Sequence, residues 1–556
     1  MSLALLAWAA IVSAPAQKPA RFEWFEYRGD DNLPRPGPGE YSNPILQGFY
    51  PDPSITRAGD DYYLVHSTFA WFPGIPVFHS RDLVNWTQIG NAIDRPNQLK
   101  FEMLGLSRGV FAPAINHHKG TFYILNTCVD CGGNFVITAK NPGGPWSDPV
   151  WLPEIEGGID PSLFFDQDGS AWILNNGPPP GTPRYDGHRA IWMQQFDTAD
   201  LKMTGPRIML LDGGVRPQEK PIWIEGPHIV RKNGWYYLIA AEGGTAEGHS
   251  QVALRSKSVT GPYQPNPANP ILTQRDLPRD RSRPITSAGH ADFVETAAGE
   301  WWTTFLAVRP YTDDYYNTGR ETFLMPVTWA DNGWPRITKP GQVVPWTATA
   351  PALPRQHAPT TPTTGPMSVR EEFDRTRLPF NWMMMRNPAA KWWAFSDGEL
   401  RLDPRPVALG DNGNPSFLAR RQQHINSSAT TKVTFEPANE SAEAGIVALQ
   451  NDNYWFYLSI GRKADSVAIR LRRRAGEGDP AAGVVVSEEA LPAKIGSAIQ
   501  LRIEAHADRY DFRWSLDGQS WRILAEGVDG KILSTKQAGG FVGAVFGLHA
   551  FQGGTR

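Results

Sequence analysis

A short phrase that recurs along residues 52–345 constrains the fold more than any other feature of the sequence. Each copy opens with a few strand-forming residues, turns tightly at Gly or Asp, and closes with a strand that carries aromatic side chains. The copies begin at Asp52, Ala112, Asp160, Gly226 and Ala291. They lie roughly 50–65 residues apart, which is the size of one four-stranded sheet with its loops. The repeats therefore predict a five-bladed β-propeller over residues 40–346.

The composition agrees with an all-β chain of more than one domain. The 556 residues include 53 Gly, 49 Pro and 21 Trp, a mixture that is typical of short strands joined by turns. A chain of this length exceeds one ordinary hydrophobic core, so at least two domains are expected. The formal net charge is -3, there is no basic stripe, and no apolar run reaches the length of about 18 residues that spans a bilayer. Neither nucleic acid nor a membrane is therefore an expected partner.

The residues that open the copies should converge, because the first strand of every propeller blade lines the central channel. Asp52 and Asp160 stand directly before a proline, and Phe111, Glu225 and His290 stand one position further back in their copies. Proline suits the first residue of a strand because it fixes φ and has no N–H to pair. Asp-Pro can also open an ordinary turn, but its recurrence at the blade starts favours three carboxylates around one channel.

Three carboxylates at the mouth of a channel suit the hydrolysis of glycosidic bonds. One carboxyl group must stay protonated to protonate the leaving oxygen, while a second, ionised group activates water. Glu225 stands in the apolar stretch PIWIEGPHIV, where burial raises the pKa of a carboxyl group, so we predict that it is the acid. Asp160 would raise that pKa further by its like charge, which leaves Asp52 as the base.

Several motifs together resemble glycoside hydrolase family 43, and especially its β-xylosidase and α-L-arabinofuranosidase members. They are GFYPDPSI, GGIDPSLFFDQDG, WIEGPHI, GHAD and GRET, in this order between Asn43 and Ile337. The resemblance implies a five-bladed propeller and hydrolysis with inversion. It also implies that Asp52 is the general base, that Asp160 orients the acid and modulates its pKa, and that Glu225 is the general acid.

The same resemblance implies a cradle for the substrate. Phe69 and Trp71 match the aromatic residues that offer their faces to a sugar ring, and Phe111 stands where relatives carry Trp. Arg320 in TGRET is expected to bind sugar hydroxyls. His290 in SAGHADFV is expected at the floor of the channel, where it would hold a water molecule or a divalent ion such as Ca²⁺. No other cofactor is expected.

The sequence pattern changes after the propeller region. Residues 347–366 are rich in Pro, Thr and Ala and are predicted to be a linker. Residues 367–556 contain regularly spaced short strands, including the Asp-Gly hairpin in SLDGQSW. They predict a β-sandwich of the jelly-roll or concanavalin-like kind. This region resembles, more weakly, the sandwich appended to many xylosidases of the family, which can lend a loop to the rim of the active site.

Residues 1–20 are interpreted as a signal peptide or N-terminal tail. An apolar stretch from Leu3 to Val12 precedes a small-residue site at 14–16, although no Lys or Arg comes before the apolar stretch. Export to the periplasm or the extracellular space is expected, with cytoplasmic retention as the alternative. Cys128 and Cys131 form a C-x-x-C pair, for which a local disulfide and two structural thiols are both open interpretations.

Together these features predict an exo-acting hydrolase that releases xylose from the non-reducing ends of β-1,4-xylo-oligosaccharides. Release of L-arabinofuranose from arabinoxylan side chains is the main alternative, and the two sugars are not ranked by the sequence. A carbohydrate-binding propeller without catalysis is a remote alternative, because it would have lost at least one carboxylate. A retaining, fructosidase-type propeller is another. The sequence also leaves open whether the chain forms a homo-oligomer.

Overall fold

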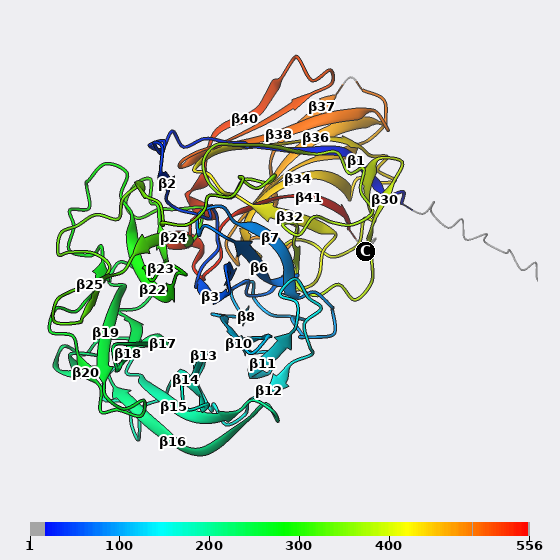
Figure 1. Ribbon diagram of the computed structural model, residues 1–556. Coiled ribbons are helices and arrows are strands. Elements are labelled where there is room, and N and C mark those ends of the chain that lie inside the picture. Colours follow the sequence, from blue (N-terminus) through cyan, green and yellow to red (C-terminus); the bar gives the residue numbers. More distant parts are fainter. Residues whose placement is uncertain (1–16, 492, 554–556) are drawn as a thin grey trace, which may run out of the picture.

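The computed structural model describes residues 17–491 and 493–553, and strands make up almost all of its regular structure (Figure 1). In this described part of the chain, residues 54–326 form five antiparallel sheets that follow one another along the sequence. The first sheet contains β3 (Ser54–Ala58), β4 (Asp61–Val65), β6 (Gly74–Ser80) and β7 (Thr87–Ile93). The second contains β8 (Gly109–Val110), β9 (Ala114–His118), β10 (Thr121–Val129), β11 (Gly133–Ala139) and β12 (Val150–Trp151).

The other three sheets continue the same pattern. The third contains β13 (Ile159–Phe165), β14 (Ala171–Gly177), β15 (Ala190–Asp197) and β16 (Lys202–Asp212). The fourth contains β17 (Glu225–Lys232), β18 (Trp235–Glu242), β19 (Ser250–Ser256), β20 (Gln264–Pro265) and β21 (Leu272–Thr273). The fifth contains β22 (Thr286–Glu295), β23 (Trp301–Val308) and β24 (Glu321–Pro326).

The inner strands of these sheets contact one another in cyclic order. Contacts run from β3 to β9, β13, β17 and β22, and from β22 back to β3, so the sheets surround a common centre (Figure 1). The hydroxyl of Ser54 joins three of these strands, because it donates to Asp292 Oδ2 at 2.8 Å and accepts from the backbone N–H of Ile115 at 3.0 Å. The Ser162 hydroxyl donates to the carbonyl of Pro227 on the next sheet. These polar links fix the first strands relative to each other.

The C-terminal region is a sandwich of two antiparallel sheets. One sheet contains β30 (Trp393–Ser396), β31 (Glu399–Leu402), β1 (Ala20–Gly29), β33 (Asn426–Thr434), β38 (Ala498–His506), β39 (Arg509–Ser515) and β40 (Arg522–Asp529), with β28 (Met367–Glu371) also paired to β1. The other contains β32 (Phe417–Arg421), β41 (Val545–Gln552), β34 (Ala442–Asn451), β35 (Tyr454–Lys463), β36 (Ser466–Ala475) and β37 (Val484–Leu491).

The two sheets differ in their environment, and the sequence of their strands reflects it. β38, with the sequence AIQLRIEAH, alternates apolar and polar residues and buries every second side chain, as a strand with one wet face should. β34 is buried along nearly its whole length, because its sheet lies between the outer sheet and the propeller region (Figure 1). The hydrophobic core of the sandwich accordingly continues into the first two sheets of the propeller region.

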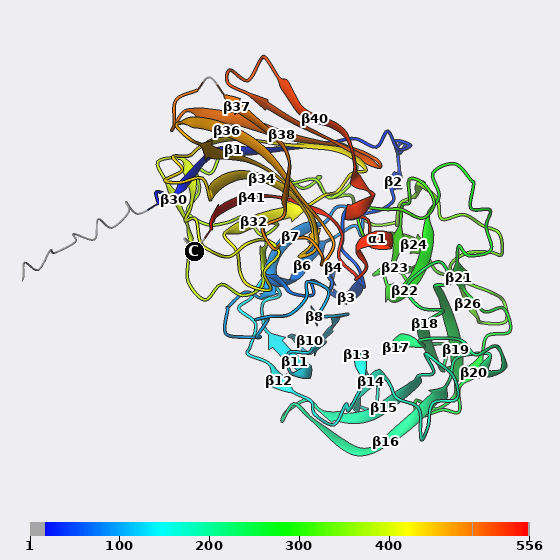
Figure 2. The ribbon, with the colours of Figure 1, turned by 180° about the vertical axis from the view of Figure 1, so that it is seen from behind.

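Short elements connect these parts. Two-stranded pairs join β2 (Glu40–Ser42) to β27 (Thr347–Thr349), β5 (Trp71–Phe72) to β29 (Met384–Met385), and β25 (Thr328–Trp329) to β26 (Pro335–Arg336). The helices are single turns, η1 (Pro217–Glu219), η2 (Gly530–Leu533) and α1 (Thr535–Ala538). Figure 2 shows α1 of the sandwich close to β22 and β24. Among the described residues, no helix has the length and apolar character to cross a membrane.

The N-terminal segment differs from the expected tail. Residues 1–16 of the predicted export segment 1–20 lie outside the described residues. Its remaining part leads directly into β1, and the side chain of Gln17 donates a hydrogen bond to the carbonyl of Glu436 in the sandwich. β1 pairs with β33 on one side and with β28 and β31 on the other. The chain therefore begins its described course inside the sandwich, where the sequence had indicated no element.

Candidate active site

The first strands of three sheets share the same irregular backbone. Asp160, Gly226 and His290 have φ values of 54°, 54° and 53°, and the pairing register shifts at each of these positions. Asp52 shares the conformation, with φ of 53°. Such a bulge with a left-handed residue bends the strand and redirects its side chain. For Asp and His this conformation is strained, and strain of this kind is frequent at functional sites.

His290 therefore occupies a different place in the repeat from the one that the sequence indicated. It is equivalent to Asp52 and Asp160, whereas Phe111 and Glu225 stand one position earlier in their copies. The alignment of the last copy by its sequence is therefore displaced by one residue from its backbone. The backbone thus presents two carboxylates and one imidazole from equivalent positions.

The five strands enclose a cavity of about 240 Å³. Seven of the eight residues predicted for the site line it, namely Asp52, Phe69, Phe111, Asp160, Glu225, His290 and Arg320. Trp223, Thr245 and Phe541 also line this cavity, and the sequence had not indicated them. The lining combines charged groups on one side with several aromatic rings, which is the composition of a pocket for a small polar ligand with apolar faces.

Asp52 lies in an environment that stabilises its ionised form. It is buried, its Oδ1 accepts a hydrogen bond from Arg320 Nη1 at 3.0 Å, and its Oδ2 accepts one from the Ser67 hydroxyl at 2.5 Å. Burial alone would raise the pKa of this carboxyl group, but Arg320, His290 and Ser67 together outweigh burial and lower it below its ordinary value. Asp52 is therefore a carboxylate over the whole neutral range.

Glu225 lies in the opposite environment. Burial, reinforced by the negative charges of Asp160 and Asp52, raises its pKa to about 8. Asp160 is tied to the same stretch of backbone, because its Oδ2 accepts a hydrogen bond from the N–H of Gly226 at 3.1 Å. Glu225 therefore keeps its proton at neutral pH.

His290 lies between the acids, and their negative charges favour its protonated form. Its Nε2 is 3.6 Å from Asp160 Oδ2. Burial alone would lower the pKa of the imidazole, but Asp160, Asp52 and Glu225 outweigh burial and raise it to about 9. Ca²⁺ prefers six or more oxygen ligands, whereas the His290 side chain offers ring nitrogens. No step proposed below uses a metal ion.

Trp71 is the predicted site residue that the structure does not bring to the cavity. It is fully buried, and its ring packs against Phe49 and Phe417, each with a centroid distance of 6.4 Å. Phe69 has a φ of 55°, and the N–H of Trp71 donates to the carbonyl of Thr68. This turn sends the two aromatic side chains in different directions. Phe69 lines the cavity, whereas Trp71 anchors the propeller region to the sandwich.

Phe541 brings the sandwich into the cavity. It stacks on Phe69 at 5.9 Å, meets Phe111 edge-on at 5.7 Å, and lies 5.3 Å from the guanidinium carbon of Arg320. The N–H of Phe541 donates to the hydroxyl of Ser107 at 2.8 Å. Three aromatic rings from two regions of the chain thus form one apolar wall of the cavity.

Comparison with known proteins places the chain in a family. The sequence model of glycosyl hydrolases family 43 matches residues 41–335. The chain belongs to this family. A second model, for the beta xylosidase C-terminal concanavalin A-like domain, matches residues 370–556. Family 43 membership makes the protein a glycoside hydrolase, and it agrees with the resemblance drawn from the sequence motifs.

Relatives in family 43 match nearly the whole chain. A protein named xylosidase/arabinosidase from Butyrivibrio fibrisolvens is 38% identical over 516 residues, which cover 92% of this chain and 96% of that protein. A non-reducing end alpha-L-arabinofuranosidase from Bacteroides ovatus is 37% identical, with 92% of both chains covered. The crystal structure of a xylan beta-1,4-xylosidase from Bacillus halodurans C-125 is 32% identical and has a TM-score of 0.82 over 92% of this chain and 97% of its own.

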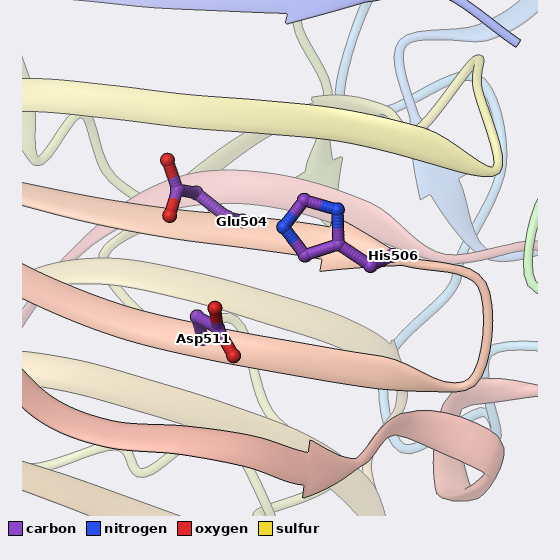
Figure 3. A group of neighbouring side chains, drawn as sticks. All are labelled: Glu504, His506 and Asp511. Carbon is purple, nitrogen blue, oxygen red and sulfur yellow. The ribbon is translucent and has the colours of Figure 1, made fainter.

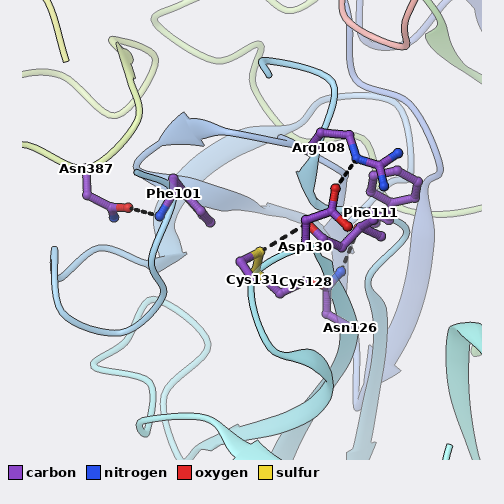
Figure 4. Close-up of a disulfide and its surroundings, with 9 residues drawn as sticks. Phe101, Arg108, Phe111, Asn126, Cys128, Asp130, Cys131 and Asn387 are labelled. Atoms are coloured by element: carbon purple, nitrogen blue, oxygen red, sulfur yellow. Dashed lines mark hydrogen bonds and ion pairs between the residues drawn. A yellow bond between two sulfur atoms is a disulfide. The ribbon is translucent and has the colours of Figure 1, made fainter. Parts of the chain in front are cut away.

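A disulfide supports one wall of the family 43 cavity. Cys128 and Cys131 are bonded to each other (Figure 4), so the first of the two interpretations of this pair is confirmed. Asp130, between them, accepts a hydrogen bond from Arg108 Nε at 2.7 Å. The guanidinium carbon of Arg108 lies 6.0 Å from the centre of the Phe111 ring. The disulfide therefore constrains a turn that reaches the aromatic wall through one ion pair.

One other cluster of polar residues in the described chain could be read as a metal site. Glu504 and His506 on β38 and Asp511 on β39 have ligand atoms within 4.8 Å of one another (Figure 3). Arg513 already satisfies both carboxylates, because its Nε donates to Glu504 at 2.6 Å and its Nη2 donates to Asp511 at 3.1 Å. The cluster is an ion-pair network on the face of a strand and lies outside the catalytic region.

Proposed function

We propose that this enzyme releases xylose from the non-reducing ends of β-1,4-xylo-oligosaccharides with inversion of the anomeric configuration. In this proposal the five sheets of residues 54–326 are the five blades of a propeller, and the cavity at their centre holds the terminal sugar. Glu225 is the general acid, Asp52 is the general base, and Asp160 raises the pKa of Glu225 and orients it.

The observation that carries the proposal is the opposite protonation of two carboxyl groups in one cavity. Glu225, with a pKa of about 8, can donate a proton to the leaving oxygen at neutral pH. Asp52, with a lowered pKa, can accept a proton from the attacking water. Two titratable groups whose environments separate their pKa values in this way are the pattern of an acid and base pair. An inverting enzyme places them about 6.5–9.5 Å apart, which leaves room for that water.

The shape of the cavity supports attack on a chain end. Its volume of about 240 Å³ suits one sugar unit with its water. Phe541, Phe69 and Phe111 can contact the apolar face of a pentose, and Arg320 can donate hydrogen bonds to its hydroxyls. Arg320 also stays paired with Asp52, so substrate binding and the charge of the base are linked through one side chain.

The proposal is tested by following hydrolysis with NMR. The enzyme is incubated with 4-nitrophenyl β-D-xylopyranoside, and the first product anomer is recorded before mutarotation. Inversion predicts α-xylose as the initial product. Initial β-xylose would contradict the assignment of Asp52 as base, since it would require a nucleophile in place of an activated water. No turnover of any xyloside would reject xylosidase activity itself.

Release of L-arabinofuranose is a second candidate, favoured by one observation. A relative that is 37% identical over most of both chains is named an alpha-L-arabinofuranosidase. The same NMR assay with 4-nitrophenyl α-L-arabinofuranoside, run beside the xyloside, ranks the two sugars by kcat/KM. The same three carboxyl groups would serve both reactions, so the ranking changes the substrate and leaves the acid and base assignments in place.

We also propose that the protein works in an oxidising compartment. The disulfide between Cys128 and Cys131 supports this, because disulfides persist mainly in exported proteins. The intact mass of protein purified from its native host, measured with and without thiol alkylation, tests it. Alkylation of both cysteines without prior reduction would contradict export.

A further inference from the structure

Trp223 stands at the mouth of the catalytic cavity as an exposed and rigidly held indole. Its side chain lines the cavity, and the residue is 39% exposed. Its φ is 51°, which is a strained conformation for a bulky residue. Its N–H donates to the carbonyl of Gly187 at 2.8 Å. The backbone therefore holds an apolar ring toward solvent at a cost in strain.

A cation fixes the orientation of this ring. The guanidinium carbon of Arg189 lies 5.0 Å from the centre of the Trp223 ring. Arg189 is itself anchored, because its Nε donates to Asn176 Oδ1 at 2.8 Å and its Nη2 donates to the carbonyl of Gly157 at 2.7 Å. One face of the indole is thus occupied by a fixed cation. The ring is pre-organised, so a ligand that contacts it need not order it first.

Trp223 also borders a second hollow outside the cavity. This outer pocket, of about 530 Å³, is lined by residues 183–189 together with Trp223. Its wall is fixed by Tyr185, whose hydroxyl lies 3.0 Å from the carbonyl oxygens of both Gly213 and Pro221 and can donate to either. Trp223 is the residue that the cavity and the outer pocket have in common. A chain-like ligand could therefore run from one to the other across the indole.

The position of the acid indicates which part of a substrate lies there. Glu225 follows Trp223 by two residues, and both side chains line the cavity. The general acid must stand beside the oxygen of the leaving group, whereas the base acts from the opposite face of the sugar. Another hollow, of about 250 Å³, lies beside Arg320 and Phe541 and so on the side of the base. The leaving group is therefore expected on the Trp223 side.

We propose that Trp223 is the stacking platform for the first sugar of the leaving group, and that the outer pocket of residues 183–189 receives the next one. The ligand is a chain of at least two β-linked pyranose units that remains after the terminal pentose is removed. A pyranose presents axial C–H groups to an aromatic ring, and its hydroxyls face the polar side chains of Arg184 and Asp186 in the outer pocket. This inference rests on the proposed function and extends it to substrate length.

The test compares substrates that differ in the leaving group. In Trp223→Ala, kcat/KM for xylotriose is expected to fall by about tenfold, the equivalent of one stacking contact of about 1.4 kcal/mol. With β-D-xylopyranosyl fluoride, whose leaving group is a single atom, kcat/KM is expected to stay within about twofold of the wild-type value. Trp223→Phe keeps a ring and should recover much of the loss on xylotriose.

The matched control is Trp151→Ala. Trp151, in β12, is 41% exposed and does not line the cavity or the outer pocket, so its loss should change neither substrate. Equal losses on both substrates in Trp223→Ala would overturn the inference, because they would mean that Trp223 only shapes the cavity. Unchanged xylotriose hydrolysis would overturn it as well. Wild-type turnover of the fluoride reports on the proposed function separately, and if it were absent both proposals would fail.

Discussion

At the scale of single residues, one backbone position presents three titratable side chains. Asp52, Asp160 and His290 share a left-handed φ, yet their partners differ. Arg320 pairs with Asp52, the N–H of Gly226 binds Asp160, and His290 faces both acids. Glu225, one position earlier in its copy, stays protonated because burial and the charge of Asp160 outweigh the cations His290 and Arg320. The neighbours, and not the residue type, therefore decide which carboxyl group can act as acid.

If Glu225 is the acid, its removal should matter most for poor leaving groups. Glu225→Ala is expected to abolish most hydrolysis of xylobiose, since the loss of a general acid costs about 10²–10⁴-fold. Hydrolysis of 2,4-dinitrophenyl β-xyloside should be affected far less, because that phenolate leaves without protonation. Asp160→Ala is the comparison variant and should lower both rates together. Equal factors for both substrates in Glu225→Ala, measured as kcat/KM, would require a different acid.

The raised pKa of Glu225 should also appear in the stability of the protein. Its folded-state pKa of about 8 exceeds the value of about 4.3 for an unfolded chain. The unfolded state therefore releases this proton first, and stability is lost as pH rises between these two values. Glu225→Gln removes this pH-dependent loss of stability. The melting temperature of the variant should therefore exceed that of the wild type by an amount that grows from pH 5 to pH 8.

Differential scanning calorimetry over that pH range checks this expectation. Glu219→Gln, on the exposed turn η1, serves as control and should leave the difference in melting temperature constant with pH. A constant difference in Glu225→Gln would show that the carboxyl group is not held protonated in the folded enzyme.

At the scale of elements, two glycine-containing loops meet and position Arg320. The N–H of Ala544 donates to the carbonyl of Asn317 at 2.7 Å. A Cβ atom at Gly543 would lie 2.6 Å from Thr318 O, and one at Gly319 would lie 2.8 Å from Gly543 Cα. The two backbones therefore approach as closely as glycine permits. The loop of the sandwich that carries Phe541 thereby also supports the segment that carries Arg320.

Gly543→Ala should disturb catalysis without a change in any cavity residue. The added methyl group pushes residues 318–320 away, and a displacement of about 1 Å can cost up to about 10²-fold in rate. Because Arg320 lowers the pKa of Asp52, its displacement should also move the acidic limb of the pH profile of kcat/KM to higher pH. Gly478→Ala, at a position with open space around it, is the control. An unchanged pH profile would show that the loop containing Gly543 does not position Arg320.

The sequence predicted the elements that repeat and missed those that do not. Four of the phrases predicted where the first strands begin and which carboxyl groups lie there, whereas the fifth, at Ala291, falls inside β22. Phe541 was missed because its contact with Phe69 joins residues far apart in the sequence, and no periodic pattern marks it. Trp71 was wrongly expected in the cavity, since a turn at Phe69 breaks the alternation of a strand. The apolar and charged residues of RFEWFEYRG could have indicated β1. A bulge at Phe22–Trp24 interrupts their alternation, so the strand pattern is hard to recognise.

At the scale of the whole molecule, the propeller region and the sandwich are joined twice. The chain leaves the sandwich after β1, forms the propeller region, and returns through residues 347–366. These residues contact both parts, as the N–H of Gln47 donates to Thr363 O, and His424 Nε2 pairs with Gly365 O. The hydrophobic core is continuous across the boundary. The two regions should therefore unfold together and not as independent domains.

Removal of β1 should then damage the sandwich as much as a deletion near the C-terminus. Deleting residues 1–30 removes the buried side chains of Phe22, Phe25 and Tyr27, each worth roughly 1.5–3 kcal/mol. It also leaves β33 without one of its two neighbours. We expect a large loss of soluble protein and a lower melting temperature. Deletion of residues 1–16 retains β1 and is the control, and equal yields of the two variants would contradict this role.

The place of β1 has a consequence during synthesis. It leaves the ribosome long before its partner β33, because the bond from Thr431 Oγ1 to the carbonyl of Trp24 spans 407 residues. At about 5–20 residues per second, β1 waits roughly 20–80 s for β33 to emerge. An unpaired strand with apolar residues can join the wrong neighbour or aggregate. Its sequence places Arg21, Glu23, Glu26 and Arg28 among its aromatic residues. These charges disfavour pairing of the unpaired strand with other chains until β33 has been synthesised.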